Sequence, residues 1–259
     1  VTDGPIGRDL LKKLESKGLL GLAYWDNGFK MMSANRPLHL PADMKGLKMR
    51  IQASKVLDEQ MRTLGANPQV MAFSEVYQAL QTGVVDGTEN PPSNLYTQKM
   101  HEVQKHLTAT NHGYIGYAVI VNKKFWDKLP ADIRTQLEGA MREATVYGDK
   151  IAQQENDAAL EAVKKSGKTT VYVPTEAEKA EWRKALLPVL IEQCTALGKR
   201  QMVAVIGDSA QAPSIRLHAA CGFEMVGTLA NIGFKFGRWL DSVLMQRPLG
   251  EGAATPPPT

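Results

Sequence analysis

Two segments indicate the fold class most clearly: Leu47-Lys48-Met49-Arg50-Ile51-Gln52 and Gly83-Val84-Val85-Asp86-Gly87-Thr88-Glu89-Asn90-Pro91-Pro92. Apolar and polar residues alternate in the first segment, which predicts a β-strand with one apolar face and places Arg50 on the other face. The second segment is a short apolar run that ends in glycine, polar residues and proline, as expected for a loop at a strand end. Ligands of α/β sheets bind outside the carboxyl ends of the strands, so we expect Arg50 and Asn90 to converge on one small anion.

Helix and strand signals alternate on both sides of these segments, and the fold class that we predict is therefore α/β. Ser54 is placed to cap a helix that Gly65 closes, and Ser74 is placed to cap another that ends at Gly83. A long helical pattern runs from 129 to 163 and stops before Gly167. The other predicted elements are helices over 9–17 and 94–104, strands over 19–25, 69–72, 107–110, 114–121 and 169–173, a turn at 26–28, and a helix that begins at Thr175.

Three long motifs in this part of the chain resemble the DctP-type solute-binding proteins of TRAP transporters. They are Met44-Lys45-Gly46-Leu47-Lys48-Met49-Arg50, Met71-Ala72-Phe73-Ser74-Glu75-Val76-Tyr77-Gln78-Ala79-Leu80-Gln81-Thr82-Gly83 and Val85-Asp86-Gly87-Thr88-Glu89-Asn90-Pro91. The resemblance extends over residues 1–182 and is nearest to members that take C4-dicarboxylates. It implies a periplasmic-binding-protein-like domain with a long spine helix, and it covers only the later part of the family's chain. Most of the first lobe is therefore expected to be missing.

Four residues are candidates for the ligand site. Arg50 is expected to hold one carboxylate through a two-pronged contact, and Asn90 to donate a further hydrogen bond. The resemblance also implies that Lys30 adds positive charge at the cleft, although the residues alone favour a solvated lysine after a turn. Phe73 is predicted at a strand-to-helix corner, where its ring either walls the pocket and excludes water or belongs to the core.

Composition and residue spacing argue against several other kinds of function. The 31 basic and 27 acidic residues give a formal charge of +4 and are scattered along the chain, without the clustered stripe that nucleic-acid binding requires. Cys194 and Cys221 have small or apolar neighbours and are expected to be buried thiols. The histidines at 101, 106 and 112 lack metal-ligand spacing and are interpreted as structural or surface residues, so no metal site is predicted.

No targeting or membrane-spanning segment is apparent. The first residues lack a basic segment followed by an apolar one, and no run approaches the roughly twenty apolar residues that cross a bilayer. The chain as written is expected to be soluble. A periplasmic protein needs a signal peptide, so either the peptide was removed or the chain is cut from something longer, and the resemblance favours truncation.

The pattern changes after residue 182. Residues 186–252 resemble the second half of a GNAT-type N-acetyltransferase of the phosphinothricin or amino-acid class, through Gln201-Met202-Val203-Ala204-Val205-Ile206-Gly207-Asp208, Ser214-Ile215-Arg216-Leu217-His218-Ala219-Ala220-Cys221-Gly222-Phe223 and Arg238-Trp239-Leu240-Asp241-Ser242-Val243-Leu244-Met245. We predict a strand over 202–206, a helix over 214–221 and an antiparallel hairpin of strands 224–232 and 239–247. The expected organisation is a solute-binding domain over 1–182, a partial GNAT-like α+β unit over 183–250, bounded by Pro188, and a disordered tail over 251–259.

The segment that resembles an acetyltransferase lacks that family's cofactor-binding loop. Acetyl-CoA binding in that family depends on a glycine-rich loop that holds pyrophosphate at a helix N-terminus, and the corresponding Ala180-Glu181-Trp182-Arg183-Lys184 contains no glycine. No cofactor is therefore expected, and no cofactor-binding residue is assigned. His218 falls where relatives carry a general acid, but a lone histidine on a helix is more easily explained by a structural role than by a catalytic one.

Three functional hypotheses follow. The leading one is binding of a C4-dicarboxylate or related organic acid in the periplasm, without catalysis, for delivery to the membrane subunits of a TRAP permease, with affinity impaired by truncation. The second is acetyl-CoA-dependent N-acetyl transfer by the C-terminal part in the cytoplasm. The third is an inactive hybrid of two gene fragments. Strand edges left open by missing halves also make self-association an expectation.

Overall fold

The computed structural model describes residues 4–235 and 237–256. The chain forms two compact units, one made of residues 1–35 and 89–171 and the other of residues 36–88 and 172–259. A six-stranded sheet has the order β4-β3-β5-β2-β6-β8, and strand β5 (Gly87–Asn90) passes from one unit into the other within it. The α/β fold class predicted from the sequence is thus present.

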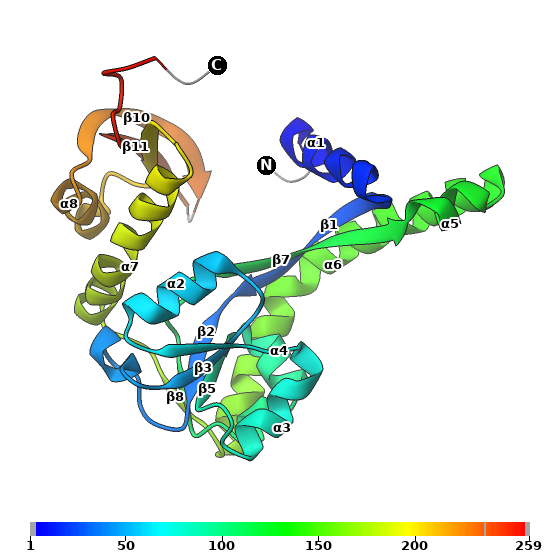
Figure 1. The fold of residues 1–259 in the computed structure, drawn as a ribbon, viewed down its shortest axis with the longest axis horizontal. Helices are drawn as coiled ribbons and strands as arrows, with labels where there is room; N and C mark the ends of the chain where they lie inside the picture. Colours follow the sequence, from blue (N-terminus) through cyan, green and yellow to red (C-terminus); the bar gives the residue numbers. More distant parts are fainter. Residues whose placement is uncertain (1–3, 236, 257–259) are drawn as a thin grey trace. The chain divides into compact units, whose positions relative to one another are not determined.

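The first unit contains an antiparallel ribbon of two strands, β1 (Leu19–Phe29) and β7 (Tyr114–Asn122), which runs along the long helix α6 (Ala131–Ser166) in Figure 1. The ribbon is paired from Leu19 opposite Asn122 to Phe29 opposite Tyr114. The predicted spine helix is confirmed, and it ends where Gly167 takes a φ of 66°. The unit's other elements are α1 (Pro5–Lys13), η1 (Leu14–Lys17), β2 (Met31–Ala34), α4 (Pro92–Thr97), η4 (Met100–Glu102), β6 (His106–Thr108) and α5 (Lys123–Lys128).

Two sequence predictions in this unit are wrong. The expected turn at 26–28 lies inside β1, which continues through a register shift between Asp26 and Gly28. A Cβ on Gly28 would lie 2.8 Å from Asn156 Nδ2 of α6, which donates to the Asn27 carbonyl at 2.8 Å. The glycine there therefore serves close helix approach and not a chain reversal. The predicted helix over 94–104 breaks after α4, because Lys99 takes a left-handed φ of 56°.

The second unit begins with parallel strands and short helices. Strand β3 (Lys48–Ile51) pairs in parallel with β4 (Asn67–Val70) and with β5. Helix α2 (Lys55–Thr63) follows β3 and is capped as predicted, since the Ser54 hydroxyl accepts from the Leu57 N–H at 3.3 Å. The expected cap at Ser74 is wrong, because this residue lies inside η3 (Phe73–Glu75), ahead of α3 (Val76–Gln81). The segment η2 (Pro41–Met44) precedes β3. Of strand β8 (Thr170–Tyr172), only the last residue, Tyr172, belongs to this unit.

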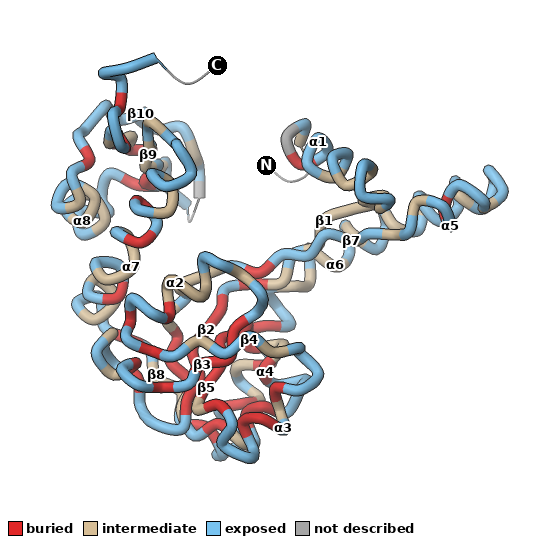
Figure 2. The backbone as a smooth tube through the Cα atoms, in the orientation of Figure 1, coloured by how far each residue is buried: buried red, intermediate tan, exposed pale blue. Residues whose placement is uncertain are grey.

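Helix α7 (Glu176–Ala196) leads to the C-terminal part of the second unit. There β9 (Gln201–Ile206), β10 (Glu224–Lys235) and β11 (Arg238–Pro248) form an antiparallel sheet of order β10-β11-β9, which confirms the predicted hairpin. Helix α8 (Ala212–Ala220) and α7 contribute to its core. The core residues are Ile191, Ile206, Phe223, Val243, Met245 and Leu249. Most residues of β10 are exposed, whereas every residue of β2 and of β5 is buried (Figure 2).

Several sequence predictions about the C-terminal part can be compared with the structure. The expected domain boundary at 182 and Pro188 both lie inside α7, and Trp182 is buried and donates its indole N–H to the His39 carbonyl at 3.0 Å. Cys194 and Cys221 are free thiols, each half-buried. Residues 257–259 of the expected disordered tail lie outside the described residues, whereas Gly252 within that tail accepts a hydrogen bond from Arg200 Nε at 2.8 Å. None of the helices described combines the length and the hydropathy that a membrane crossing needs.

Candidate functional site

Arg50 is a buried cation on β3. Its side chain is almost wholly enclosed, with 2% of the residue exposed, and the strand is buried on both faces because Met49 and Ile51 are buried as well. Nε and Nη2 of the guanidinium donate to the Met71 carbonyl at 3.1 and 2.8 Å. This forked contact fixes the plane of the guanidinium, and an arginine at any accessible pH carries its positive charge into that position.

Phe73 lies against the same guanidinium. It follows β4 and opens η3, and its ring centroid is 5.6 Å from Arg50 Cζ, which is a cation–π distance. The residue is 37% exposed, so the ring meets both the arginine and the surface. The predicted corner position is confirmed, and the structure brings Phe73 and Arg50 together. The ring of Phe73 therefore supplies an apolar wall beside a fixed positive charge.

Lys30 belongs to a buried polar cluster in the first unit. It lies between β1 and β2, only 4% exposed, so the alternative of a solvated lysine is wrong. Its Nζ is 2.6 Å from Glu89 Oε1, and its backbone N–H donates to the Gly113 carbonyl at 2.8 Å. A Cβ on Gly113 would lie 3.0 Å from Lys30 Cε, so a glycine at that position leaves room for the lysine stem. The charge of Lys30 is thus balanced within the protein by Glu89.

His112 completes this cluster, although the sequence interpretation assigned it no role in a site. Its Nε2 lies 2.9 Å from Glu89 Oε2, and its Nδ1 lies 2.6 Å from the Thr110 hydroxyl. Glu89 therefore has one carboxylate oxygen on a lysine and the other on an imidazole. The only signal in the sequence was that His112 falls in the segment 110–114, next to the predicted strand, and spacing gave no link to residue 89.

The environment of Glu89 sets its ionisation. Burial raises the pKa of this carboxyl, but the hydrogen bond and charge of His112, together with those of Lys30, outweigh burial and leave the pKa below its usual value of 4.5. Glu89 is consequently ionised at neutral pH. A carboxylate held in this way positions the Lys30 ammonium and balances its buried charge.

Asn90 is the neighbour of Glu89 on β5 and is 1% exposed. Its Nδ2 lies 3.7 Å from Met100 Sδ. In the second unit, Thr88 of the same strand pairs in register with Arg50. Of the four predicted ligand residues, the structure therefore joins Arg50 with Phe73, and it joins Lys30 with Glu89, which the sequence prediction did not include.

His218, the weak catalytic candidate, lies on α8. Its Nδ1 is 2.8 Å from the Ser214 carbonyl one turn earlier, and its ring packs edge-on against Phe223 with centroids 5.2 Å apart. Both contacts are explained by the packing of the helix. The segment 180–184, which the acetyltransferase resemblance aligned with a cofactor loop, is helical here as part of α7.

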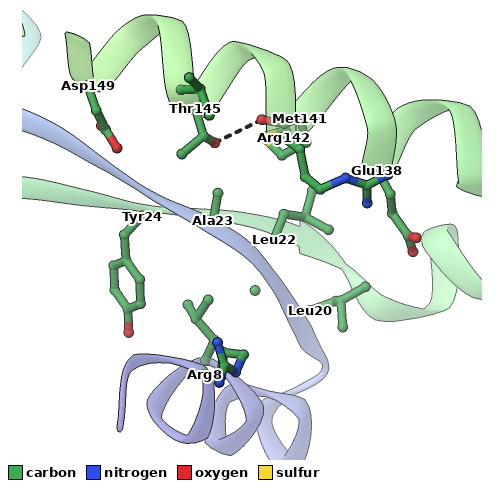
Figure 3. A pocket seen from close by; sticks show the side chains of 13 residues that line it. Arg8, Leu20, Leu22, Ala23, Tyr24, Glu138, Met141, Arg142, Thr145 and Asp149 are labelled. Atoms are coloured by element: carbon green, nitrogen blue, oxygen red, sulfur yellow. Dashed lines mark hydrogen bonds between the residues drawn. The ribbon is translucent and has the colours of Figure 1, made fainter. Parts of the chain in front are cut away.

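A separate cavity of about 740 Å³ lies in the first unit between α1, β1 and α6. Figure 3 shows Arg8, Tyr24 and Arg142 around it, together with the hydrogen bond from the Thr145 hydroxyl to the Met141 carbonyl of 2.8 Å. None of the four predicted ligand residues lines it. The cavity is therefore distinct from the cluster around Lys30 in the same unit.

The comparisons with known proteins agree on one family. The family model described as bacterial extracellular solute-binding protein, family 7 (DctP) matches residues 1–195. The chain is 62% identical over 211 residues to the C4-dicarboxylate-binding periplasmic protein DctP of Rhodobacter capsulatus, which covers 82% of this chain and 63% of that protein. It is 42% identical over 188 residues to the C4-dicarboxylate-binding protein DctB of Bacillus subtilis, which covers 72% of this chain and 54% of that protein.

Solved structures give the same result for the fold. A TRAP periplasmic solute-binding protein from Shewanella oneidensis with bound succinate has a TM-score of 0.73 and 39% identity, over 76% of this chain and 65% of that chain. A TRAP periplasmic solute-binding protein from Pseudomonas aeruginosa with bound L-malate has a TM-score of 0.71 and 39% identity, over 74% of this chain and 67% of that chain. The periplasmic-binding-protein-like fold predicted from the sequence is confirmed.

The comparisons also set the limits of this likeness. The chain spans between about half and two thirds of the length of these curated relatives, at 63% and 54%. The family match extends past residue 182 to residue 195, and the comparisons give no support to the acetyltransferase resemblance of 186–252. The matched residues include the β3 strand, the β5 strand and all four predicted ligand residues. The chain therefore belongs to the DctP family of bacterial extracellular solute-binding proteins.

Proposed function

We propose that this chain binds a C4-dicarboxylate or a closely related organic acid as the solute receptor of a TRAP transporter. The observation that carries the proposal is Arg50, a permanently charged guanidinium buried on β3 and oriented by the Met71 carbonyl, in a chain whose relatives are C4-dicarboxylate-binding proteins. Forked contacts between a guanidinium and a carboxylate are among the stronger polar contacts in proteins. The solved relatives with bound succinate and L-malate support the same ligand class.

The ligand residues keep separate roles in this proposal. Arg50 binds one carboxylate, Phe73 excludes water on one side of the guanidinium, and Asn90 donates a further hydrogen bond. Lys30 contributes positive potential, but its ammonium is already paired with Glu89 at 2.6 Å. We therefore assign the larger share of ligand affinity to Arg50, because its carbonyl partner at Met71 leaves the positive charge in place.

No catalysis is needed for this function. The family's role implies a periplasmic location and delivery of the bound acid to the membrane subunits of a permease, and both belong to the proposal. Because the chain spans 63% of the Rhodobacter capsulatus relative, we expect it to bind the acid more weakly than a full-length receptor does. No cofactor takes part.

Isothermal titration calorimetry tests the proposal. Succinate, L-malate and acetyl-CoA are titrated in parallel into the full 259-residue chain and into the variants Arg50→Lys and Phe73→Ala. Arg50→Lys is expected to weaken succinate binding by about tenfold or more, because an ammonium lacks the planar fork, and a hydrogen bond to charge contributes about 1.5–3 kcal/mol. Phe73→Ala, which alters a side chain at the surface, is expected to weaken binding less.

The matched control is Arg62→Lys. Arg62 is an exposed arginine on α2 that pairs with Asp58 at 2.7 Å, and its replacement is expected to leave binding unchanged. Circular dichroism of each variant shows whether it is folded. The proposal fails if neither acid releases heat, or if folded Arg50→Lys binds succinate as the unaltered chain does. Heat from acetyl-CoA alone would favour the acetyltransferase hypothesis, which stays a prediction.

A further inference from the structure

Strand β9 presents an ordered edge in the second unit. Within the described residues it pairs with β11 on one side and ends the sheet on the other. The register places Ile206 opposite Val243 and Met202 opposite Arg247, and it continues to Arg200, whose carbonyl accepts from the Leu249 N–H at 3.0 Å. In an antiparallel pair the bonded residues alternate, so the even-numbered residues bond to β11. The N–H and C=O groups of Gln201, Val203 and Val205 consequently point away from it.

The side chains of the outward-bonding residues are also exposed. Val203 is 56% exposed and Val205 is 67% exposed, whereas Ile206 belongs to the core and Met202 and Ala204 pack against it. β9 thus has one face on the core of α7 and α8 and an apolar opposite face. Exposed valines beside unpaired main-chain groups are a template for strand addition.

β9 also lacks the features that usually protect an edge strand. Residues 201–206 contain no proline and no charged side chain, and the register with β11 has no shift. The other edge of this sheet, β10, is interrupted by two register shifts, between Met225 and Gly227 and between Leu229 and Gly233. Bulges of that kind twist an edge away from partners, so β9 is the edge of this sheet that is better suited to strand addition.

The chemistry of the strand favours a second copy of itself as that partner. Lys199 and Arg200 precede β9, and Arg200 is already paired with Glu251 at 3.4 Å. Asp208 follows β9 and is paired with Arg238, and the nearby Asp241 carboxylate accepts from the Ser209 hydroxyl and the Asn231 N–H. Each end of the strand therefore keeps one net charge, positive before β9 and negative after it, so antiparallel self-pairing places the basic end of one copy beside the acidic end of the other. Parallel pairing would instead place like charges together. The strand also lies beyond residues 1–195 that the family model matches, so the family's fold does not account for what covers it.

We propose that two copies of this chain associate by antiparallel pairing of their β9 strands. The two three-stranded sheets then form one continuous sheet of order β10-β11-β9-β9-β11-β10, related by a two-fold axis through β9. Val203 and Val205 of both copies form one apolar strip on the face opposite the core. The interface is independent of the ligand residues and of the function proposed above.

Sedimentation velocity and light scattering of the full chain over a range of protein concentrations measure this association. The unaltered chain is expected to reach twice its mass of 28.4 kDa as the concentration rises. Val203→Pro removes an outward N–H without removing a bond to β11, and Val205→Lys places a charge on the apolar strip. By symmetry each change acts twice, and each is expected to raise the dimer dissociation constant by about tenfold or more.

Val226→Lys is the matched control. Val226 is a 58% exposed valine on β10 of the same sheet, and its replacement is expected to leave the dimer intact. Circular dichroism confirms that each variant keeps its fold. A monomeric chain at every concentration overturns the proposal, as does a folded Val203→Pro variant with unchanged association. Loss of the dimer in Val226→Lys but not in Val205→Lys would place the interface on β10 and would also overturn it.

Discussion

At the residue scale, the Glu89 carboxylate joins Lys30 and His112 in one buried cluster. Glu89 is 1% exposed and has Lys30 on one oxygen and His112 on the other, at 2.6 and 2.9 Å. A buried ion pair contributes little net stability compared with apolar residues of the same size, but loss of one partner leaves an uncompensated charge. The cluster is therefore sensitive to any change at residue 89.

Glu89→Gln is expected to destabilise the protein by about 3–5 kcal/mol, because it leaves the Lys30 ammonium buried beside a neutral amide. Urea unfolding followed by circular dichroism measures the change. Glu102→Gln serves as the control, since Glu102 pairs with Lys168 at the surface, and its loss is expected to leave the unfolding midpoint unchanged. Equal stability of the two variants would contradict a structural role for the buried pair.

The same carboxylate predicts a dependence of stability on pH. Its pKa in the folded protein is below the usual value of 4.5, so its contribution is fully present above that value and is lost as pH falls through the folded pKa. The difference in unfolding free energy between the unaltered chain and Glu89→Gln is expected to be larger above about pH 4.5 than well below it. Urea titrations at a series of pH values test this, and a difference that grows towards acid pH would contradict it.

At the scale of elements, helix α7 is the clearest case of a local rule that the tertiary structure overrides. Pro188 removes one main-chain donor inside a helix of 21 residues, yet the helix is continuous from Glu176 to Ala196. Its first turn is fixed by Thr175, which caps the helix in a reciprocal pair with Glu178. Buried Trp182, Val189 and Ile191 anchor the helix on either side of the proline. Packing therefore outweighs the local cost of the proline.

Pro188→Ala is expected to stabilise the protein by about 1–3 kcal/mol, because the side chain at 188 is exposed and alanine restores the missing donor without loss of packing. Thermal unfolding followed at 222 nm is the measurement. Leu190→Ala, at an exposed position in the same helix, controls for the general effect of an alanine there. A lower melting temperature for Pro188→Ala would mean that the proline relieves a strain that the helix otherwise carries.

At the scale of the whole molecule, the chain is organised into two compact units that do not coincide with the sequence-based division at 182. That division lies within α7, where Trp182 binds the His39 carbonyl from inside the second unit. Residues 197–200, after the helix, include the exposed Leu197, which is 72% exposed, and the turn glycine Gly198 with a φ of 70°. An exposed segment, 197–199, therefore follows α7, whereas residue 182 lies inside the helix.

Limited trypsin digestion is expected to cut after Lys199 before it cuts after Arg183 or Lys184. The first site follows a helix end in an exposed segment, whereas the other two are within the hydrogen-bonded turns of α7. Mass spectrometry of the early fragments measures the order of cleavage. Denatured chain digested in parallel gives the intrinsic preference of the protease, and first cleavage at 183 or 184 in the folded protein would instead support a boundary near 182.

Local chemistry in the sequence predicted much of the fold correctly. Ser54 caps α2 as its position indicated, and the glycines at 18, 65 and 167 adopt the left-handed backbone that ends a helix. Such features depend on neighbours within a few residues, so their effect is visible in the chain alone. Gly28 was misread because the sequence does not show Asn156 of α6, which lies 128 residues away and approaches that glycine.

The amino-acid sequence alone was enough to predict most of the helices and strands, the strand that carries Arg50 and the resemblance to the DctP family, because these depend on periodicity, capping and motif. Strand β2 (Met31–Ala34), in the interior of the six-stranded sheet, was not among the predicted elements. Only the tertiary structure decided which charges meet. Lys30 and Glu89 are 59 residues apart and Glu89 and His112 are 23 apart, and their contacts exist because the folded sheet and its loops bring these segments together. Strand order is set by packing over the whole chain, so no local pattern specifies such contacts.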